Sequence, residues 1–152
     1  MTRVRIPFSD TIISANKSMA ELQAMLQYLK FDVVAGVIES RRMVMARHGR
    51  AEFRFEADPS KILAIQGIRR PTPQQIEQAE KIAWRYLSWQ VKTLCDGIKL
   101  GMVEVSQALG GYLVFRNPEN GATTSLAAYI TEKVASGDLD SSRSIAGLIE
   151  SK

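Results

Sequence analysis

The feature that most constrains the fold is a long helical segment in the middle of the chain. Between Thr72 and Gly101 the only proline is Pro73, and the only internal glycine is Gly97. Thr72 can cap free backbone N–H groups, and Gln75 can reach back to that cap. Pro73 occupies the first helical position, where no N–H is needed. The sequence therefore predicts one helix of roughly 25–28 residues.

This helix is apolar around much of its circumference. A first stripe at near-helical spacing consists of Ile76, Ala79, Ala83, Leu87, Val91, Leu94 and Ile98. Ile82, Tyr86 and Trp89 form a second stripe, and Trp84 lies on a third side. A surface helix usually buries one stripe. We therefore expect a second layer against it, made by C-terminal segments or by a second copy of the chain. Trp84, Tyr86 and Trp89 are candidate interface residues, with burial of the tryptophans in the core as the alternative.

The first half of the chain predicts a small antiparallel sheet with one helix. Residues 3–6 alternate charged and apolar side chains, and a capping box from Ser18 to Glu21 opens a helix over about 19–30. Three strands follow at 33–38, 43–46 and 53–55, with turns at 40–42 and 47–50. Connections this short require antiparallel neighbours. The order is thus β-α-β-β-β.

The second half adds short elements. We expect helices over 61–65, 103–109 and 126–136, and a strand over 112–115. Residues 138–152 form a Ser- and Asp-rich tail with a short apolar set, which is either frayed or a short helix that docks on a partner. The predicted class is α+β: one domain over 1–137, with a small antiparallel sheet packed on one long central helix and short C-terminal helices.

Composition excludes several classes of protein. The 152 residues are 45% hydrophobic and 24% charged, which is typical of a globular chain. The longest apolar runs are far shorter than a membrane span, and no apolar leader follows Met1. The single cysteine, Cys95, cannot form an internal disulfide, and its place in a helix predicts a buried, reduced thiol. These features predict a protein of the cytosol.

No catalytic chemistry is recognisable. One histidine, His48, and one cysteine cannot supply the four ligands of a closed zinc site. The chain has no nucleophile-elbow, phosphate-loop or dinucleotide-binding glycine motif. We therefore expect no catalytic residues, no metal and no cofactor, and a protein that is not an enzyme.

Basic residues are concentrated in the first half. Residues 1–72 hold 12 Lys and Arg against 7 Asp and Glu, whereas residues 73–152 hold 8 against 9. This excess is compatible with a polyanionic partner and equally with an ordinary solvated surface. Successive hairpin turns lie at opposite ends of a strand, so the basic turns need not form one patch. Phe53 and Phe55 are expected in the core rather than as stacking platforms. The candidate nucleic-acid contacts are Arg41, Arg42, Arg47, Arg50, Arg54, Arg69 and Arg70.

Three short motifs resemble a family of small proteins of tailed bacteriophages and prophages. They are Ile6-Pro7-Phe8-Ser9, the run from Ile82 to Leu87 with Trp89, and Gly101-Met102. The resemblance covers about residues 4–125. It departs from the family in placing Trp89 two residues after Leu87 instead of three, and in Gly110-Gly111 where the family has a proline. The resemblance implies a phage origin and supplies no catalytic residues.

Together these observations predict a non-enzymatic phage accessory protein of the host cytoplasm. The leading hypothesis is nucleic-acid binding, as an oligomer, in genome replication or recombination. An alternative is an anti-defence or host-takeover protein that inhibits a host protein or sequesters a nucleotide signal. A virion or assembly component and an enzyme of unrecognised kind are further alternatives.

Overall fold

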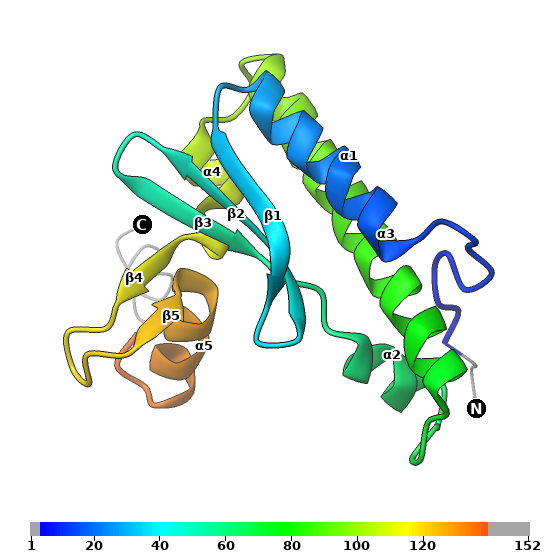
Figure 1. Ribbon diagram of the computed structural model, residues 1–152. Coiled ribbons are helices and arrows are strands. Elements are labelled where there is room, and N and C mark those ends of the chain that lie inside the picture. Colours follow the sequence, from blue (N-terminus) through cyan, green and yellow to red (C-terminus); the bar gives the residue numbers. More distant parts are fainter. Residues whose placement is uncertain (1–3, 140–152) are drawn as a thin grey trace, which may run out of the picture.

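The long central helix is present and unbroken (Figure 1). The computed structural model describes residues 4–139, and in it α3 spans Pro73–Lys99, 27 residues. The predicted capping box forms, since the Gln75 amide donates to Thr72 Oγ1 at 3.2 Å and the Thr72 amide donates to Gln75 Oε1 at 2.9 Å. Gly101, at φ 69°, takes the left-handed conformation that ends the helix. The prediction from this segment is confirmed.

The sheet has three antiparallel strands, β1 (Asp32–Ile38), β2 (Arg41–His48) and β3 (Ala51–Phe55), in the order β1-β2-β3. Both connections are two-residue turns, tighter than predicted. Glu39 and Ser40 form the first, both with positive φ, and Gly49 with Arg50 forms the second. The arginine pair 41–42 and residues 47–48 therefore belong to β2 itself.

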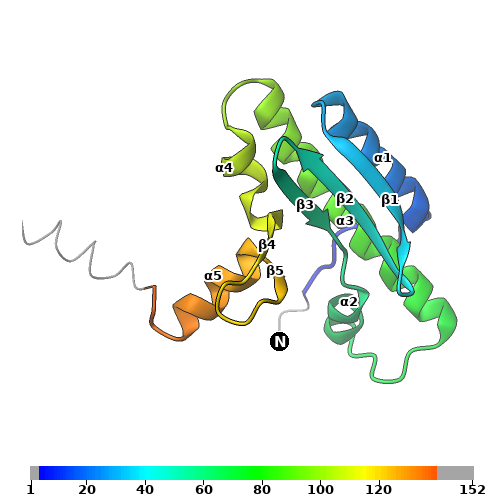
Figure 2. The same cartoon turned by 60° about the vertical axis from the view of Figure 1, so that its left-hand side comes forward.

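Two helices cover one face of the sheet, and Figure 2 shows α1 and α3 behind the strands. α1 spans Ala15–Tyr28 and begins one turn earlier than predicted, because Ser14 rather than Ser18 is the cap. Ser18 is instead fully buried. The core lies between the helices and the sheet, and its largest fully buried side chains include Leu22, Phe55 and Trp84.

The predicted N-terminal strand is not formed in the part of it that the structure describes. Val4–Ile6 has no regular secondary structure, and residues 1–3 lie outside the described range. The following segment lies against α3, where the Gln78 side chain donates to the carbonyl oxygens of Ser9 at 3.4 Å and Thr11 at 3.0 Å. The edge of β3 is used by the second half of the chain, through a bridge between Phe53 and Leu113. The other edge, that of β1, has no strand neighbour in residues 4–139.

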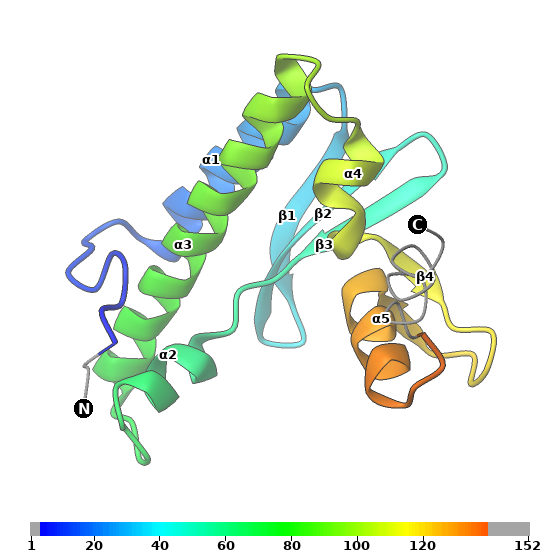
Figure 3. The ribbon, with the colours of Figure 1, turned by 180° about the vertical axis from the view of Figure 1, so that it is seen from behind.

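Short elements make up the rest. α2 (Pro59–Ile65) packs on α3, and α4 (Val105–Leu109) and the 3₁₀ turn η1 (Gly110–Tyr112) follow α3. β4 (Val114–Arg116), β5 (Thr123–Ser125) and α5 (Leu126–Ala135) form what we call the C-terminal arm. Figures 1 and 3 show this arm beside β3, away from α1.

These elements agree with the predicted α+β class and with three of the predicted short helices, at shifted boundaries. Most of the predicted tail, residues 140–152, lies outside the described range. Among residues 4–139 no helix combines the length and the apolar character needed to cross a bilayer.

Candidate functional site

An aromatic cluster lies on the exposed side of α3. It consists of Phe8, Tyr86 and Trp89, with ring centroids 6.3 Å apart for Phe8 and Trp89 and 5.9 Å apart for Tyr86 and Trp89. Trp89 is 53% exposed and Tyr86 is 42% exposed. Phe8 is held at φ 60°, a backbone conformation that is unfavourable for a residue with a side chain. Large aromatic side chains left open on a rigid helix are typical of protein interfaces.

Trp84 does not belong to this cluster, and its assignment as an interface residue is wrong for the single chain. It is 1% exposed and packs in the core with Leu87 and Val91. Trp84, Leu87 or Ser88, Val91 and Cys95 recur at three- and four-residue intervals, which places them on one side of the helix. Trp89 lies five residues after Trp84 and therefore points elsewhere.

The candidate arginines of β2 occupy its two ends, about 20 Å apart at 3.3 Å per residue. Those at the first end are paired within the protein. Arg42 forms an ion pair with Glu80 of α3 and donates to Asn16 Oδ1 of α1 at 3.0 Å. Arg41 pairs with Glu56 at 3.2 Å. Arg42 thus links the sheet to both helices, and its role in this structure is architectural.

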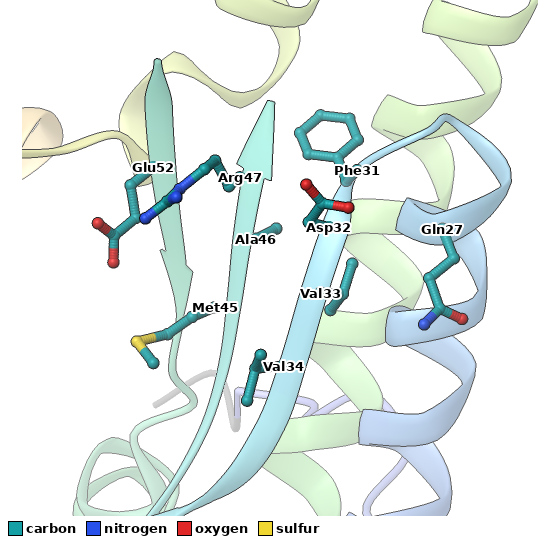
Figure 4. A pocket seen from close by; sticks show the side chains of 9 residues that line it. All are labelled: Gln27, Phe31, Asp32, Val33, Val34, Met45, Ala46, Arg47 and Glu52. Atoms are coloured by element: carbon teal, nitrogen blue, oxygen red, sulfur yellow. The ribbon is translucent and has the colours of Figure 1, made fainter. Parts of the chain in front are cut away.

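At the other end of β2, Arg47 and Arg50 are exposed and form no ion pair with any residue in 4–139. Arg47 lines a hollow of about 530 Å³ together with Asp32 and Glu52. Figure 4 shows these side chains. By register Asp32, Arg47 and Glu52 form one row across the three strands. Two carboxylates therefore flank this arginine, which weakens the local positive potential. Lys30, exposed in the turn that precedes β1, belongs to the same end of the sheet.

The remaining candidate arginines lie in different places. Arg54 is half-buried on the open face of β3, whereas Arg69 and Arg70 are exposed in the loop between α2 and α3. The structure therefore distributes the seven arginines over several surfaces and does not bring them together. Phe53 and Phe55 are buried, as the alternation predicted.

Two features bear on the chemistry of the described residues, namely their possible metal ligands and the thiol of Cys95. Within residues 4–139 no three histidine, cysteine or acidic side chains come close enough to hold a metal ion. Burial raises the pKa of the Cys95 thiol to about 11, with Lys99 lowering it and Asp96 raising it to smaller extents. The protonated thiol is a poor nucleophile, so Cys95 is a core residue.

Sequence reasoning missed Phe8 as a member of the aromatic cluster. The reason is that its contact with Trp89 joins segments 81 positions apart. The only local signal was an aromatic residue directly after a proline. Lys30 was likewise missed, because its proximity to the second turn depends on strand register.

Comparisons with protein-family models, with curated proteins and with solved structures found no match to this chain.

Proposed function

We propose that this chain is a non-enzymatic binding protein of phage or prophage origin, which acts in the host cytoplasm by docking on another protein through its aromatic cluster. The observation that carries this proposal is the exposure of Trp89 and Tyr86, 53% and 42%, on the 27-residue helix α3, whose other side packs in the core. Through this surface the protein binds and inhibits a host protein, in anti-defence or in host takeover.

Three physical features support a protein partner. Tryptophan and tyrosine supply large contact areas at a small cost in conformational entropy, and they dominate the binding energy of many interfaces. Phe8 adds a third ring and is retained in an unfavourable backbone conformation. The cluster is built on a 27-residue helix whose opposite side is anchored in the core, so little ordering is needed on binding.

The test compares two double variants. Tyr86→Ser with Trp89→Ser removes the exposed aromatic surface, and Val34→Ser with Val37→Ser removes exposed apolar side chains that are 65% and 63% exposed on β1. Light scattering gives the mass of each protein, and quantitative mass spectrometry identifies what each tagged protein retains from a bacterial lysate.

We expect the aromatic variant alone to lose its partner, by more than tenfold. If the lost partner is a second copy, the mass falls from oligomer to monomer. Equal retention and equal mass in wild type, aromatic variant and control would reject the proposal.

A second candidate function is nucleic-acid binding, and one observation favours it. Arg47 and Arg50 are exposed and unpaired within residues 4–139, at the end of the sheet that also holds Lys30. Side chains free of internal ion pairs can neutralise phosphates and release counterions. Arg41 and Arg42 are already paired with carboxylates and are not expected to contribute.

Fluorescence anisotropy with a labelled oligonucleotide, measured between about 50 and 200 mM salt, tests this candidate. Arg47→Gln with Arg50→Gln should weaken binding and reduce the slope of log K against log salt by about 2, one for each lost phosphate contact. Arg41→Gln is the matched control and should leave the slope unchanged. Binding that does not depend on salt would contradict it.

A further inference from the structure

A polar cavity of about 350 Å³ lies between the open face of β3 and the C-terminal arm. Its lining shares no residue with the aromatic cluster or with the hollow around Arg47. Its polar lining comes from three segments far apart in the sequence: Arg54, Glu56, Tyr112, Thr123, Thr124 and Ser125.

Arg54 is the unusual member of this lining. Its Nε atom is buried and has no hydrogen-bond partner, and the guanidinium group forms no ion pair in the described part of the chain. Leaving a buried donor of a charged group unsatisfied costs free energy, so nearly all such groups have a partner. A planar guanidinium in this state is suited to bind the oxygens of an anion.

The opposite wall supplies further donors. Thr123 carries a hydroxyl group on the side of β5 that Ser125 and Val114 share. Burial, with a smaller effect of Tyr86, raises the pKa of Tyr112, so its phenol stays a neutral donor. Ser125 caps α5, and Ala127, in the first turn of that ten-residue helix, also lines the cavity. The positive end of the helix dipole therefore adds to the charge of Arg54.

One carboxylate lines the same cavity, and its charge is compensated. Glu56 pairs with Arg41 at 3.2 Å. The lining thus contains one carboxylate, that of Glu56, which is paired with an arginine outside the lining, and one guanidinium, that of Arg54, which has no ion-pair partner in residues 4–139. The cavity has room for on the order of ten waters, at about 30 Å³ each, which is more than a bare phosphate ion needs.

We propose that this cavity is a binding site for the phosphoryl group of a small phosphate ester, with Arg54 as its charged ligand and Thr123 as a hydroxyl donor. The Arg54 fork holds two of the oxygens, and the organic part of the ester fills the remaining volume beside Val114. This site does not depend on the protein-docking function proposed above.

The experiment titrates the full chain with inorganic phosphate, adenosine 5′-monophosphate and adenosine, by calorimetry and by the shift in melting temperature. We expect the monophosphate to bind tighter than inorganic phosphate, adenosine not to bind, and Arg54→Gln to weaken the monophosphate at least tenfold. Lys61→Gln, at an exposed position of α2 outside the lining of the cavity, also removes one positive charge; it is the control and should bind as wild type. Arg54→Lys should restore part of the affinity.

The Arg54→Gln substitution removes a buried donor that has no partner in the free protein. Without ligand, the melting temperature of this variant should therefore equal or exceed that of wild type, whereas the loss of a purely structural arginine would lower it. If that variant fails to fold, Thr123→Val, at an exposed position of β5, should weaken the monophosphate several-fold. The proposal is rejected if adenosine binds as well as its monophosphate, if inorganic phosphate binds tighter than the ester, or if the Arg54 and Lys61 variants lose affinity equally.

Discussion

The sheet with α1 and α3 is held together differently from the C-terminal arm. In the former, Leu22 and Phe55 are fully buried and Trp84 is 1% exposed. In the arm, no residue of α5 is buried, and Ile130 and Val134 are 43% and 58% exposed. The arm relies on local contacts, among them the hydrogen bond from the Leu126 amide to the Leu113 carbonyl at 2.8 Å.

This difference indicates that stability is unevenly distributed. Burial of apolar surface is the main favourable term in folding, whereas single caps and surface ion pairs contribute about 1 kcal/mol or less. Segments with few buried apolar contacts open at a lower free energy than the whole domain. We therefore expect the arm to open locally while the rest of the domain stays folded. Residues of β3 and of the C-terminal arm together line the proposed phosphate site, so a bound ligand should hold the arm against the sheet.

The largest expected effect comes from truncating matched apolar side chains in the two regions. Trp84→Ala should lower the free energy of unfolding by about 3–5 kcal/mol, because it leaves a cavity in the core. Ile130→Ala, on the exposed face of α5, should change it by less than about 0.5 kcal/mol. Chemical denaturation followed by tryptophan fluorescence or circular dichroism measures both. Similar losses for the two variants would contradict the comparison.

The next effect is a pH dependence of the free energy of unfolding, which arises in the core between the sheet and its helices. Folding raises the pKa of Cys95 from its ordinary value of 9.0 to about 11, because the buried environment disfavours the thiolate. Its contribution is therefore fully present below pH 9 and is lost as the pH rises toward 11, by about 2–3 kcal/mol in total.

Denaturation curves of wild type and Cys95→Ala between pH 7 and 11 separate the contribution of the Cys95 thiol from that of lysines and tyrosines, which titrate in both proteins. The difference in unfolding free energy between the two proteins should be constant up to about pH 9 and then change steadily. A difference that stays constant over the whole range would show that the thiol is not protected in the core.

The smallest effect concerns the two helix caps. Thr72→Ala removes the cap of α3 and should lower the global stability by about 1 kcal/mol. Ser125→Ala removes the Oγ that accepts from the Ala128 amide at 3.2 Å. We expect it to leave the global midpoint unchanged and to speed amide exchange in α5 about fivefold, the equivalent of about 1 kcal/mol. A shift of the global midpoint would mean that the arm unfolds with the rest.

The parts of the fold that could be predicted are those with local causes. The capping box of α3 and the caps of α2 and α5 are hydrogen bonds between residues two or three positions apart. Residue types at these positions are therefore enough to predict them. The strand predicted over residues 3–6 had the right alternation, but alternation does not supply a neighbouring strand with a free edge. The first hairpin turn was misplaced, because Glu39 and Ser40 adopt positive φ without being glycine.

The candidate site was harder to predict, because it depends on contacts between distant residues. Arg42 has no neighbour in the sequence that would predict its pairing, because its partners Asn16 and Glu80 lie 26 and 38 positions away. The sequence does not show which of the two tryptophans in α3 is buried, and only the packing of the sheet and α1 distinguishes Trp84 from Trp89. The isolated guanidinium of Arg54 depends on where the C-terminal arm folds.

The open edge of β1 has a practical consequence for anyone who produces this protein. Val33, Val34, Ala35, Gly36 and Val37 form a run without lysine, proline or any charge, which are the usual guards of an unpaired strand. Concentrated stocks should therefore recruit further chains at this strand and lose soluble material on storage. One lysine in place of Val37, which is 63% exposed, would prevent that recruitment at little expense to the fold.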